Sequence, residues 1–149
     1  MLITGVSGLL GSNLSFCWRE RYKIVGLYRR NPWSFPGIET KCACLDDRAL
    51  LQKIFFEFRP QIVIHTAALA RPDYCEAHQD EALAVNVGGT ETVALLAKQY
   101  EAKLVYISSD TVYDGRKGNS SESDPTGPLS YYASTKLKGE ERALQTADR

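Results

Sequence analysis

Short apolar runs alternate with longer helical patterns along the whole chain. The apolar runs are typical of strands, and they predict strands at residues 1–4, 22–28, 41–45, 62–64 and 104–107. Between these runs, apolar residues recur at helical spacing, which predicts helices at residues 9–18, 48–58, about 79–100 and 131–147. Strands that are separated by helices predict a parallel sheet whose connections are right-handed crossovers.

Local signals mark the ends of these elements. Asp47 is a typical N-cap residue for the helix at 48–58, and Pro60 ends that helix. Stretches with Gly, Ser and Pro predict loops at 31–40 and 114–130, and a further loop follows the fourth strand. The sequence therefore predicts an α/β fold of the Rossmann type, a doubly wound parallel sheet of about five strands.

Length and composition are those of one ordinary globular domain. A chain of 149 residues has room for a single core, so we treat residues 1–149 as one domain. The 18 basic residues equal the 18 acidic ones in number, which gives no sign of binding to nucleic acid or to an anionic membrane. No apolar run is long enough to span a membrane, and the chain starts with a strand instead of a signal peptide. We therefore expect a cytoplasmic protein with neither nucleic-acid nor membrane partners.

The cysteines and histidines do not form a metal-binding pattern. No two cysteines have the Cys-x-x-Cys spacing, and neither His65 nor His78 lies at a ligand spacing from a cysteine. Cys42 and Cys44 alternate as they would on one face of a strand. We therefore expect no metal site, and we expect buried free thiols in a reducing compartment at Cys17, Cys42, Cys44 and Cys75.

The first eleven residues contain the clearest chemical signal. Gly5, Gly8 and Gly11 link the first strand to the first helix, and a strand, turn and helix of this kind bind a nucleotide pyrophosphate. The first glycine permits the tight turn, the second lets the backbone approach the phosphates, and the third lets the helix pack against the strand. A plain glycine-rich turn is the alternative, and it is nearly as well supported by the spacing alone. The predicted contact residues are Gly5, Ser7, Gly8, Leu9, Leu10 and Gly11.

Polar residues gather where the predicted strands end. They lie at residues 5–11, 29–30, 65–68 and 108–110. Ligands of open parallel sheets bind beyond the carboxyl ends of the strands. This coincidence predicts a nucleotide-binding cleft at that edge of the sheet.

Two arginines follow the second strand. Enzymes that prefer NAD place a carboxylate there to accept a hydrogen bond from the ribose 2′-OH, whereas a guanidinium pairs with the 2′-phosphate of NADP. Arg29 and Arg30 occupy this place, and no acidic residue follows until Glu39. We therefore predict NADP(H) as the preferred cofactor and NAD(H) as the second choice. The alternative is a pair of solvated surface arginines.

A second chemical pattern begins the last predicted helix. Tyr132 and Lys136 are four residues apart, which puts both side chains on one face of a helix. A lysine near a phenol favours the phenolate, so we expect Lys136 to lower the Tyr132 pKa and to let it exchange a proton near neutral pH. Such a pair is weak by itself. Here the pair comes after a strand that leads into Ser109, in a chain that begins with the glycine pattern. This combination favours the nucleotide interpretation.

Five motifs extend over nearly the whole chain. They are Thr4-Gly5-Val6-Ser7-Gly8-Leu9-Leu10-Gly11, His65-Thr66-Ala67-Ala68, Val85-Asn86-Val87-x-Gly89-Thr90, Ile107-Ser108-Ser109-Asp110 and Pro125-x-x-Pro128-x-x-x-Tyr132-x-x-x-Lys136-x-x-Gly139-Glu140. With them the chain resembles the extended short-chain dehydrogenase/reductases that modify sugar nucleotides. Its segments 73–76 and 109–115 are most similar to the dTDP-4-dehydrorhamnose reductase branch, which also contains the regulatory beta subunit of methionine adenosyltransferase.

The resemblance implies a role for each matching residue. Tyr132 would protonate the substrate carbonyl oxygen as a hydride arrives from the nicotinamide, and Ser109 would donate a hydrogen bond to the same oxygen. Lys136 would hold the nicotinamide ribose and would lower the pKa of the phenol. Ala67 and Ala68 would lie close to the adenosine ribose. The implied catalytic set is therefore Ser109, Tyr132 and Lys136, of which the last two also bind the cofactor.

The implied function is an NADP-dependent reductase of a nucleotide-activated keto-sugar. A non-catalytic NADP-binding module that regulates a partner, like the methionine adenosyltransferase beta subunit, is the alternative. An epimerase or dehydratase of the same fold is a third interpretation, although dehydratases usually have an acid pair where this chain has Asp110 and Thr111. Thr111 also replaces a tyrosine that is common in the rhamnose branch, and Cys44 replaces an aspartate that often contacts adenine.

The family continues beyond the helix that contains Tyr132, whereas this sequence ends at Arg149. We therefore expect the C-terminal substrate domain to be missing. The dinucleotide should still bind, but keto-sugar reduction should be negligible without the segments that close the site. The uncovered edge of the fifth strand should favour a homo-oligomer.

Overall fold

The computed structural model describes residues 1–147 and contains five strands and seven helical segments besides one short π-helical turn. The strands are β1 (Leu2–Thr4), β2 (Val25–Tyr28), β3 (Glu39–Cys42), β4 (Ile62–His65) and β5 (Lys103–Tyr106). The α-helices are α1 (Leu9–Trp18), α2 (Arg48–Phe58), α3 (Pro72–Ala77), α4 (Gln79–Leu83), α5 (Gly89–Gln99) and α6 (Tyr131–Ala147). A π-helical turn spans Ala84–Gly88, and a 3₁₀ turn spans Asp110–Val112.

The five strands form one parallel sheet in the order β3-β2-β1-β4-β5. The chain moves outward from β1 to β2 and β3, and it then returns to place β4 on the other side of β1. The strand order therefore reverses between β1 and β4, which is where open parallel sheets bind their ligands. The predicted Rossmann-type sheet is confirmed.

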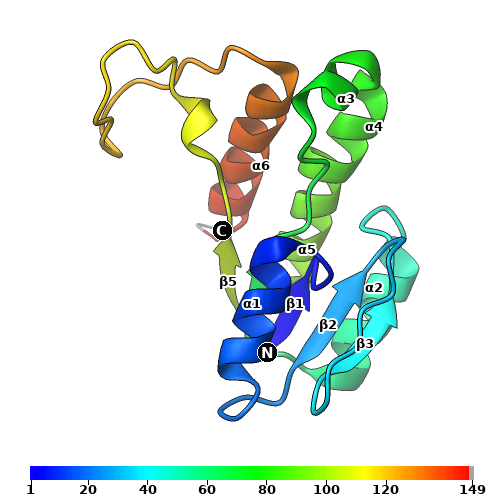
Figure 1. Cartoon of the computed structure of the whole chain (residues 1–149). Helices are drawn as coiled ribbons and strands as arrows, with labels where there is room; N and C mark the ends of the chain where they lie inside the picture. The colour runs from blue at the N-terminus through cyan, green and yellow to red at the C-terminus, as the bar shows by residue number, and fades with distance from the viewer. Residues whose placement is uncertain (148–149) are drawn as a thin grey trace.

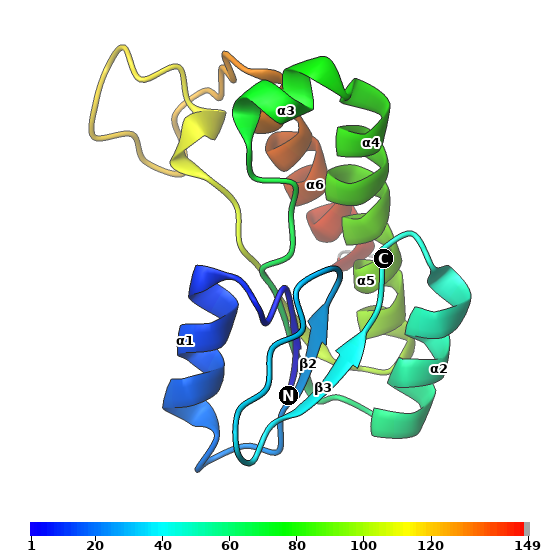
Figure 2. The same ribbon diagram turned by 45° about the vertical axis from the view of Figure 1, so that its right-hand side comes forward.

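Helices cover both faces of the sheet, as Figures 1 and 2 show. Because strand side chains alternate, Leu2 points to the face that α2 and α5 cover, whereas Ile3 packs on the face that α1 covers. Both side chains are fully buried. The last helix, α6, lies beside α5 and packs over β5, where the Tyr106 hydroxyl donates to the Lys136 carbonyl at 3.0 Å.

Local sequence signals give the bounds of three helices correctly. The predicted ranges 9–18, 48–58 and 131–147 agree with α1, α2 and α6. The Asp47 carboxylate accepts a hydrogen bond from the Leu50 N–H at 2.9 Å, as an N-cap residue should. These helices therefore depend on spacing and capping that can be read locally.

The bounds predicted for the second and third strands are wrong by several residues, and those of the first, fourth and fifth strands differ from the structure by one residue. The second strand begins at Val25 instead of Tyr22, because it pairs with β1, whose first paired residue is Leu2. The third strand covers Glu39–Cys42 instead of 41–45, because it pairs with β2 at the edge of the sheet and has few apolar residues. Strand limits follow from the neighbouring strand, which the local pattern does not contain.

The predicted set of buried cysteines is also partly wrong. Cys17 and Cys42 are exposed, Cys44 is half-buried beyond the end of β3, and Cys75 is fully buried. All four thiols are free. The shift of the third strand explains why Cys42 and Cys44 do not share a strand.

The long helix expected at 79–100 is interrupted. It consists of α4, the π-helical turn and α5, and a short helix, α3, precedes it where a loop was expected. Inside the turn, Asn86 accepts a hydrogen bond from the Leu69 N–H at 2.7 Å and donates to the Thr135 hydroxyl at 3.0 Å. The turn thus directs a buried amide towards two other segments. Single π-turns inside helices are frequent at functional sites.

Strand β5 forms one edge of the sheet. Its Val105 side chain is 36% exposed, and an exposed apolar edge favours association between copies. We expect this chain to self-associate and Val105→Lys to shift it towards the monomer, because a charge at the edge opposes strand pairing. Sedimentation velocity would measure this, with Leu95→Lys on the exposed side of α5 as the matched control. An unaltered chain that stays monomeric at every concentration would contradict the prediction.

No helix within residues 1–147 is both long enough and apolar enough to cross a lipid bilayer.

Candidate functional site

The glycine pattern forms a tight turn between β1 and α1. Gly5 has a φ of +70°, and the Gly8 N–H donates to the Gly5 carbonyl at 2.9 Å. A Cβ on Gly5 would lie 2.9 Å from the backbone nitrogen of Ala67, and a Cβ on Gly11 would lie 2.3 Å from the Gly5 carbonyl oxygen. The turn therefore requires glycine at both positions, for backbone conformation and for close approach.

The start of α1 has the properties of an anion site. Gly8 is its N-cap residue and makes no side-chain cap hydrogen bond, and the first turn contains no acidic residue. The first N–H groups of a helix have no partner within the helix, and the helix dipole places partial positive charge there. A phosphate can accept hydrogen bonds from these N–H groups.

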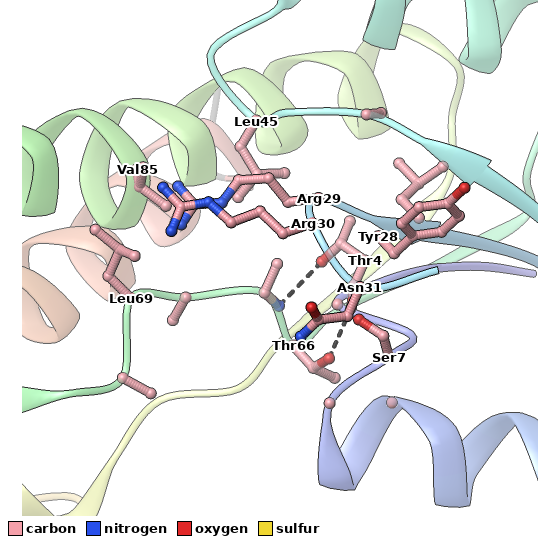
Figure 3. A pocket seen from close by; sticks show the side chains of 18 of the residues that line it. Thr4, Ser7, Tyr28, Arg29, Arg30, Asn31, Leu45, Thr66, Leu69 and Val85 are labelled. Atoms are coloured by element: carbon pink, nitrogen blue, oxygen red, sulfur yellow. Dashed lines mark hydrogen bonds between the residues drawn. The ribbon is translucent and has the colours of Figure 1, made fainter. Parts of the chain in front are cut away.

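A cavity of about 420 Å³ opens beside this turn, and Figure 3 shows many of its side chains. It brings together predicted cofactor residues from the turn after β1, the start of α1, the segment after β2 and the loop after β4. These residues are Gly5, Ser7, Gly8, Leu9, Leu10, Gly11, Arg29, Arg30, Ala67 and Ala68. The remaining two predicted cofactor residues, Tyr132 and Lys136, are not among its lining residues.

A network of buried side chains fixes the wall of the cavity. The Thr4 hydroxyl accepts a hydrogen bond from the Ala67 N–H at 3.2 Å, and the Thr66 hydroxyl donates to the Thr4 carbonyl at 2.6 Å (Figure 3). His65 lies between the hydroxyls of Thr4 at 2.7 Å and Thr90 at 3.1 Å. Burial, with a smaller effect from the Lys136 charge, lowers the His65 pKa to about 3. His65 is therefore a neutral structural group at physiological pH.

Arg29 and Arg30 lie at the far end of the cavity, and Figure 3 shows their side chains extending towards Val85. The Arg29 guanidinium forms an ion pair with the Glu81 carboxylate at 3.3 Å. Glu81 is 52 residues away in the sequence, so sequence analysis found no acid near these arginines. Arg30 is exposed.

Sequence analysis also missed an acidic residue on the cavity wall. Asp46, two residues before the start of α2, lines the cavity together with Leu45. The resemblance to the family placed Cys44 at the position where an aspartate often contacts adenine. The sequence signal that could have identified Asp46 is its position just beyond the third strand, on the side where ligands bind.

The Tyr132 and Lys136 side chains do not interact in the expected way. The Lys136 ammonium donates to the Ile107 carbonyl at 2.6 Å and lies 4.2 Å from the centre of the Tyr106 ring. Lys136 is 4% exposed, and burial lowers its pKa to about 8. It is thus held against β5, on the side of α6 that faces the sheet.

The expected lowering of the Tyr132 pKa is wrong for this structure. Burial raises the pKa of this phenol, and the nearby Ser109 hydroxyl opposes that rise only in part. Lys136 is not among the groups that act on it, because its ammonium is turned to Ile107. The phenol is therefore protonated at neutral pH.

Ser109 lies after β5 and caps the 3₁₀ turn. Its hydroxyl is 2.7 Å from the Thr111 hydroxyl, and it accepts a hydrogen bond from the Thr111 N–H at 3.3 Å. The structure therefore brings Ser109 close to Tyr132, while Lys136 lies deeper against β5. Within residues 1–147, no three His, Cys, Asp or Glu side chains gather into a group that could hold a metal ion.

The sequence matches the profile of the RmlD substrate binding domain family over residues 1–149. It is 37% identical to methionine adenosyltransferase 2 subunit beta from Bos taurus, over 97% of this chain and 42% of that protein. The chain thus spans less than half the length of this curated relative.

Two solved structures have the same fold. One is a hypothetical dTDP-4-dehydrorhamnose reductase from Sulfolobus tokodaii, with a TM-score of 0.89 and 35% identity, covering 97% of this chain and 51% of that one. The other is MoeE5 in complex with UDP-glucose and NAD, with a TM-score of 0.88 and 31% identity, covering 99% of this chain and 49% of that one.

Proposed function

Because the chain belongs to the RmlD substrate binding domain family, we propose that it binds NADP(H) and supplies the cofactor half of an NADP-dependent reductase of a nucleotide-activated keto-sugar. The observation that supports this most directly is the single cavity that joins the glycine turn to Arg29 and Arg30. Its two ends suit the two kinds of phosphate in NADP. The helix N-terminus would bind the pyrophosphate, and the arginines would bind the 2′-phosphate.

NAD(H) is the second cofactor that this site would accept. MoeE5 was crystallised with NAD, and the pyrophosphate end of the cavity makes no distinction between the two dinucleotides. The proposed preference for NADP(H) is based on Arg29 and Arg30. Asp46 and Leu45 would then lie beside the adenosine end.

For the chemical step, NADPH would supply a hydride to the substrate carbonyl carbon. Tyr132 would donate its phenolic proton to the carbonyl oxygen, and its raised pKa suits a group that must arrive protonated. Ser109 would donate a hydrogen bond to the same oxygen. Lys136 can bind a ribose hydroxyl in addition to the Ile107 carbonyl, because an ammonium group has three donors.

The first test is the double variant Arg29→Ala/Arg30→Ala. We expect it to weaken NADPH binding about ten- to a hundredfold, about 1.5–3 kcal/mol for a lost charge-assisted phosphate contact, and to leave NADH binding nearly unchanged. Isothermal titration calorimetry would measure both affinities. Arg21→Ala/Arg48→Ala is the matched control, because it removes the same charge from exposed positions outside the cavity. Equal affinities of the unaltered chain for NADPH and NADH would contradict the proposal.

A second function is supported by the similarity to the methionine adenosyltransferase subunit over 97% of this chain. In that case the chain would bind NADP and regulate a partner without reducing a sugar. An assay of methionine adenosyltransferase activity distinguishes the two functions. A regulatory module should alter the activity of a methionine adenosyltransferase from the same organism when NADPH is present, and it should do so with Tyr132→Phe as well.

A further inference from the structure

The acid that pairs with Arg29 is held in place by a second bond. One oxygen of the Glu81 carboxylate lies 3.3 Å from the Arg29 guanidinium, and the other accepts a hydrogen bond from the Tyr74 hydroxyl at 2.5 Å. The Tyr74 ring stacks on His78 with the ring centres 4.1 Å apart. Both carboxylate oxygens are thus engaged, and the carboxylate has a defined position.

This ion pair lies at the edge of the cofactor cavity. A smaller hollow of about 260 Å³ adjoins it, lined by Arg29, Arg30, Arg71 and Tyr74 together with residues 68–70. Arg29, Arg30 and residues 68–70 line both spaces. A phosphate that reaches Arg29 from the cavity therefore approaches the Glu81 carboxylate as well.

A carboxylate and a phosphate compete for the same guanidinium, and they repel each other. The Tyr74 hydroxyl and the Arg29 guanidinium keep the Glu81 pKa below its ordinary value, so Glu81 is charged at neutral pH. The neutral ribose 2′-OH of NAD meets no such repulsion. It can also donate a hydrogen bond to a carboxylate.

We propose that Glu81 is a specificity-determining residue that competes with the cofactor 2′-phosphate for Arg29 and thereby limits the preference for NADP(H) over NAD(H). The inference rests on the proposed nucleotide function. It assigns opposite effects to two residues that touch each other. Arg29 favours the phosphorylated cofactor, and Glu81 opposes it.

The variant Glu81→Gln tests this inference with little change in shape. Its amide oxygen can still accept the hydrogen bond from Tyr74, but its charge is gone. We expect NADPH to bind about two- to tenfold more tightly, which is the range for release of a partly exposed ion pair and removal of a like charge. NADH affinity should stay the same or fall. Calorimetry with both dinucleotides gives the ratio of the NADPH affinity to the NADH affinity.

Asp80→Asn is the matched control, because it removes the same charge from the neighbouring exposed residue. A change in the overall electrostatic field of the protein would alter the NADPH affinity of both variants alike, whereas local competition for Arg29 would alter that of Glu81→Gln alone. The tighter NADPH binding should also vanish in an Arg29→Ala background, since the guanidinium for which the two anions compete is then absent. Thermal unfolding of each variant would show whether the fold is retained.

The outcomes separate this inference from the function on which it rests. If the unaltered chain binds both dinucleotides and Glu81→Gln leaves their affinity ratio unchanged, the inference is overturned and the proposed function stands. The same holds if Asp80→Asn shifts the ratio equally, or if the shift persists without Arg29. If the unaltered chain binds neither dinucleotide, the proposed function fails and the inference falls with it.

Discussion

Replacing Tyr132 with phenylalanine should abolish carbonyl reduction while dinucleotide binding is retained. The substitution removes only the hydroxyl, which the proposed mechanism uses as proton donor, and loss of such a group typically costs about 10²- to 10⁴-fold in rate. Tyr132 is not among the lining residues of the cavity beside the glycine turn, so the pyrophosphate and adenosine contacts should be unaffected.

The rate can be measured in a chimaera in which residues 1–149 are followed by the C-terminal half of the Sulfolobus tokodaii relative, a chain of the same fold with a TM-score of 0.89. Reduction of dTDP-4-dehydrorhamnose is followed by NADPH absorbance. Tyr131→Phe is the control, because it removes the same hydroxyl from the adjacent position. Undiminished turnover of the Tyr132→Phe chimaera would show that another group donates the proton.

Gly11→Ala should both destabilise the chain and remove dinucleotide binding. The added Cβ would lie 2.3 Å from the Gly5 carbonyl oxygen and 2.9 Å from the Val6 Cα. These are backbone atoms, which cannot rotate away as a flexible side chain can. Ordinary overpacking costs about 1–3 kcal/mol, and we expect a loss at or above the upper end of that range. Any relief of the collision must move α1 away from the turn, and this displaces the N–H groups that would bind the pyrophosphate.

Urea unfolding and NADPH titration together test this expectation. Gly88→Ala is the matched control, because a Cβ there would meet no atom within 4 Å, so it should unfold at the same or a slightly higher urea concentration. An alanine variant at position 11 with unchanged stability and unchanged NADPH affinity would contradict the close approach of α1 to the turn.

Much of the site could be predicted because its parts are local in the sequence. The glycine turn, the start of α1 and the two arginines after β2 each lie within a few residues, and their chemistry follows from residue type and spacing. The parallel strand order then brings these segments to one edge of the sheet, where the cavity contains ten of the twelve residues predicted to bind the cofactor.

The missing parts depend on contacts between distant segments. Glu81 reaches Arg29 across 52 residues, and Asp46 lines the same cavity as residues from β1, β2 and the loop after β4. The Tyr132 pKa is another example. Helical spacing places Lys136 on the same side of α6, but the position of its ammonium is decided by the Ile107 carbonyl on the neighbouring strand.

The sequence alone determined the alternation of strands and helices, the bounds of α1, α2 and α6, and the glycine turn, because hydrophobic spacing, capping and backbone freedom act over a few residues. Tertiary structure alone decided the strand limits, the π-helical turn at Asn86, the partner of Arg29 and the direction of the Lys136 side chain. Each of these depends on which backbone carbonyl, carboxylate or strand lies opposite. That neighbouring group comes from a distant part of the chain, and no local sequence pattern identifies it.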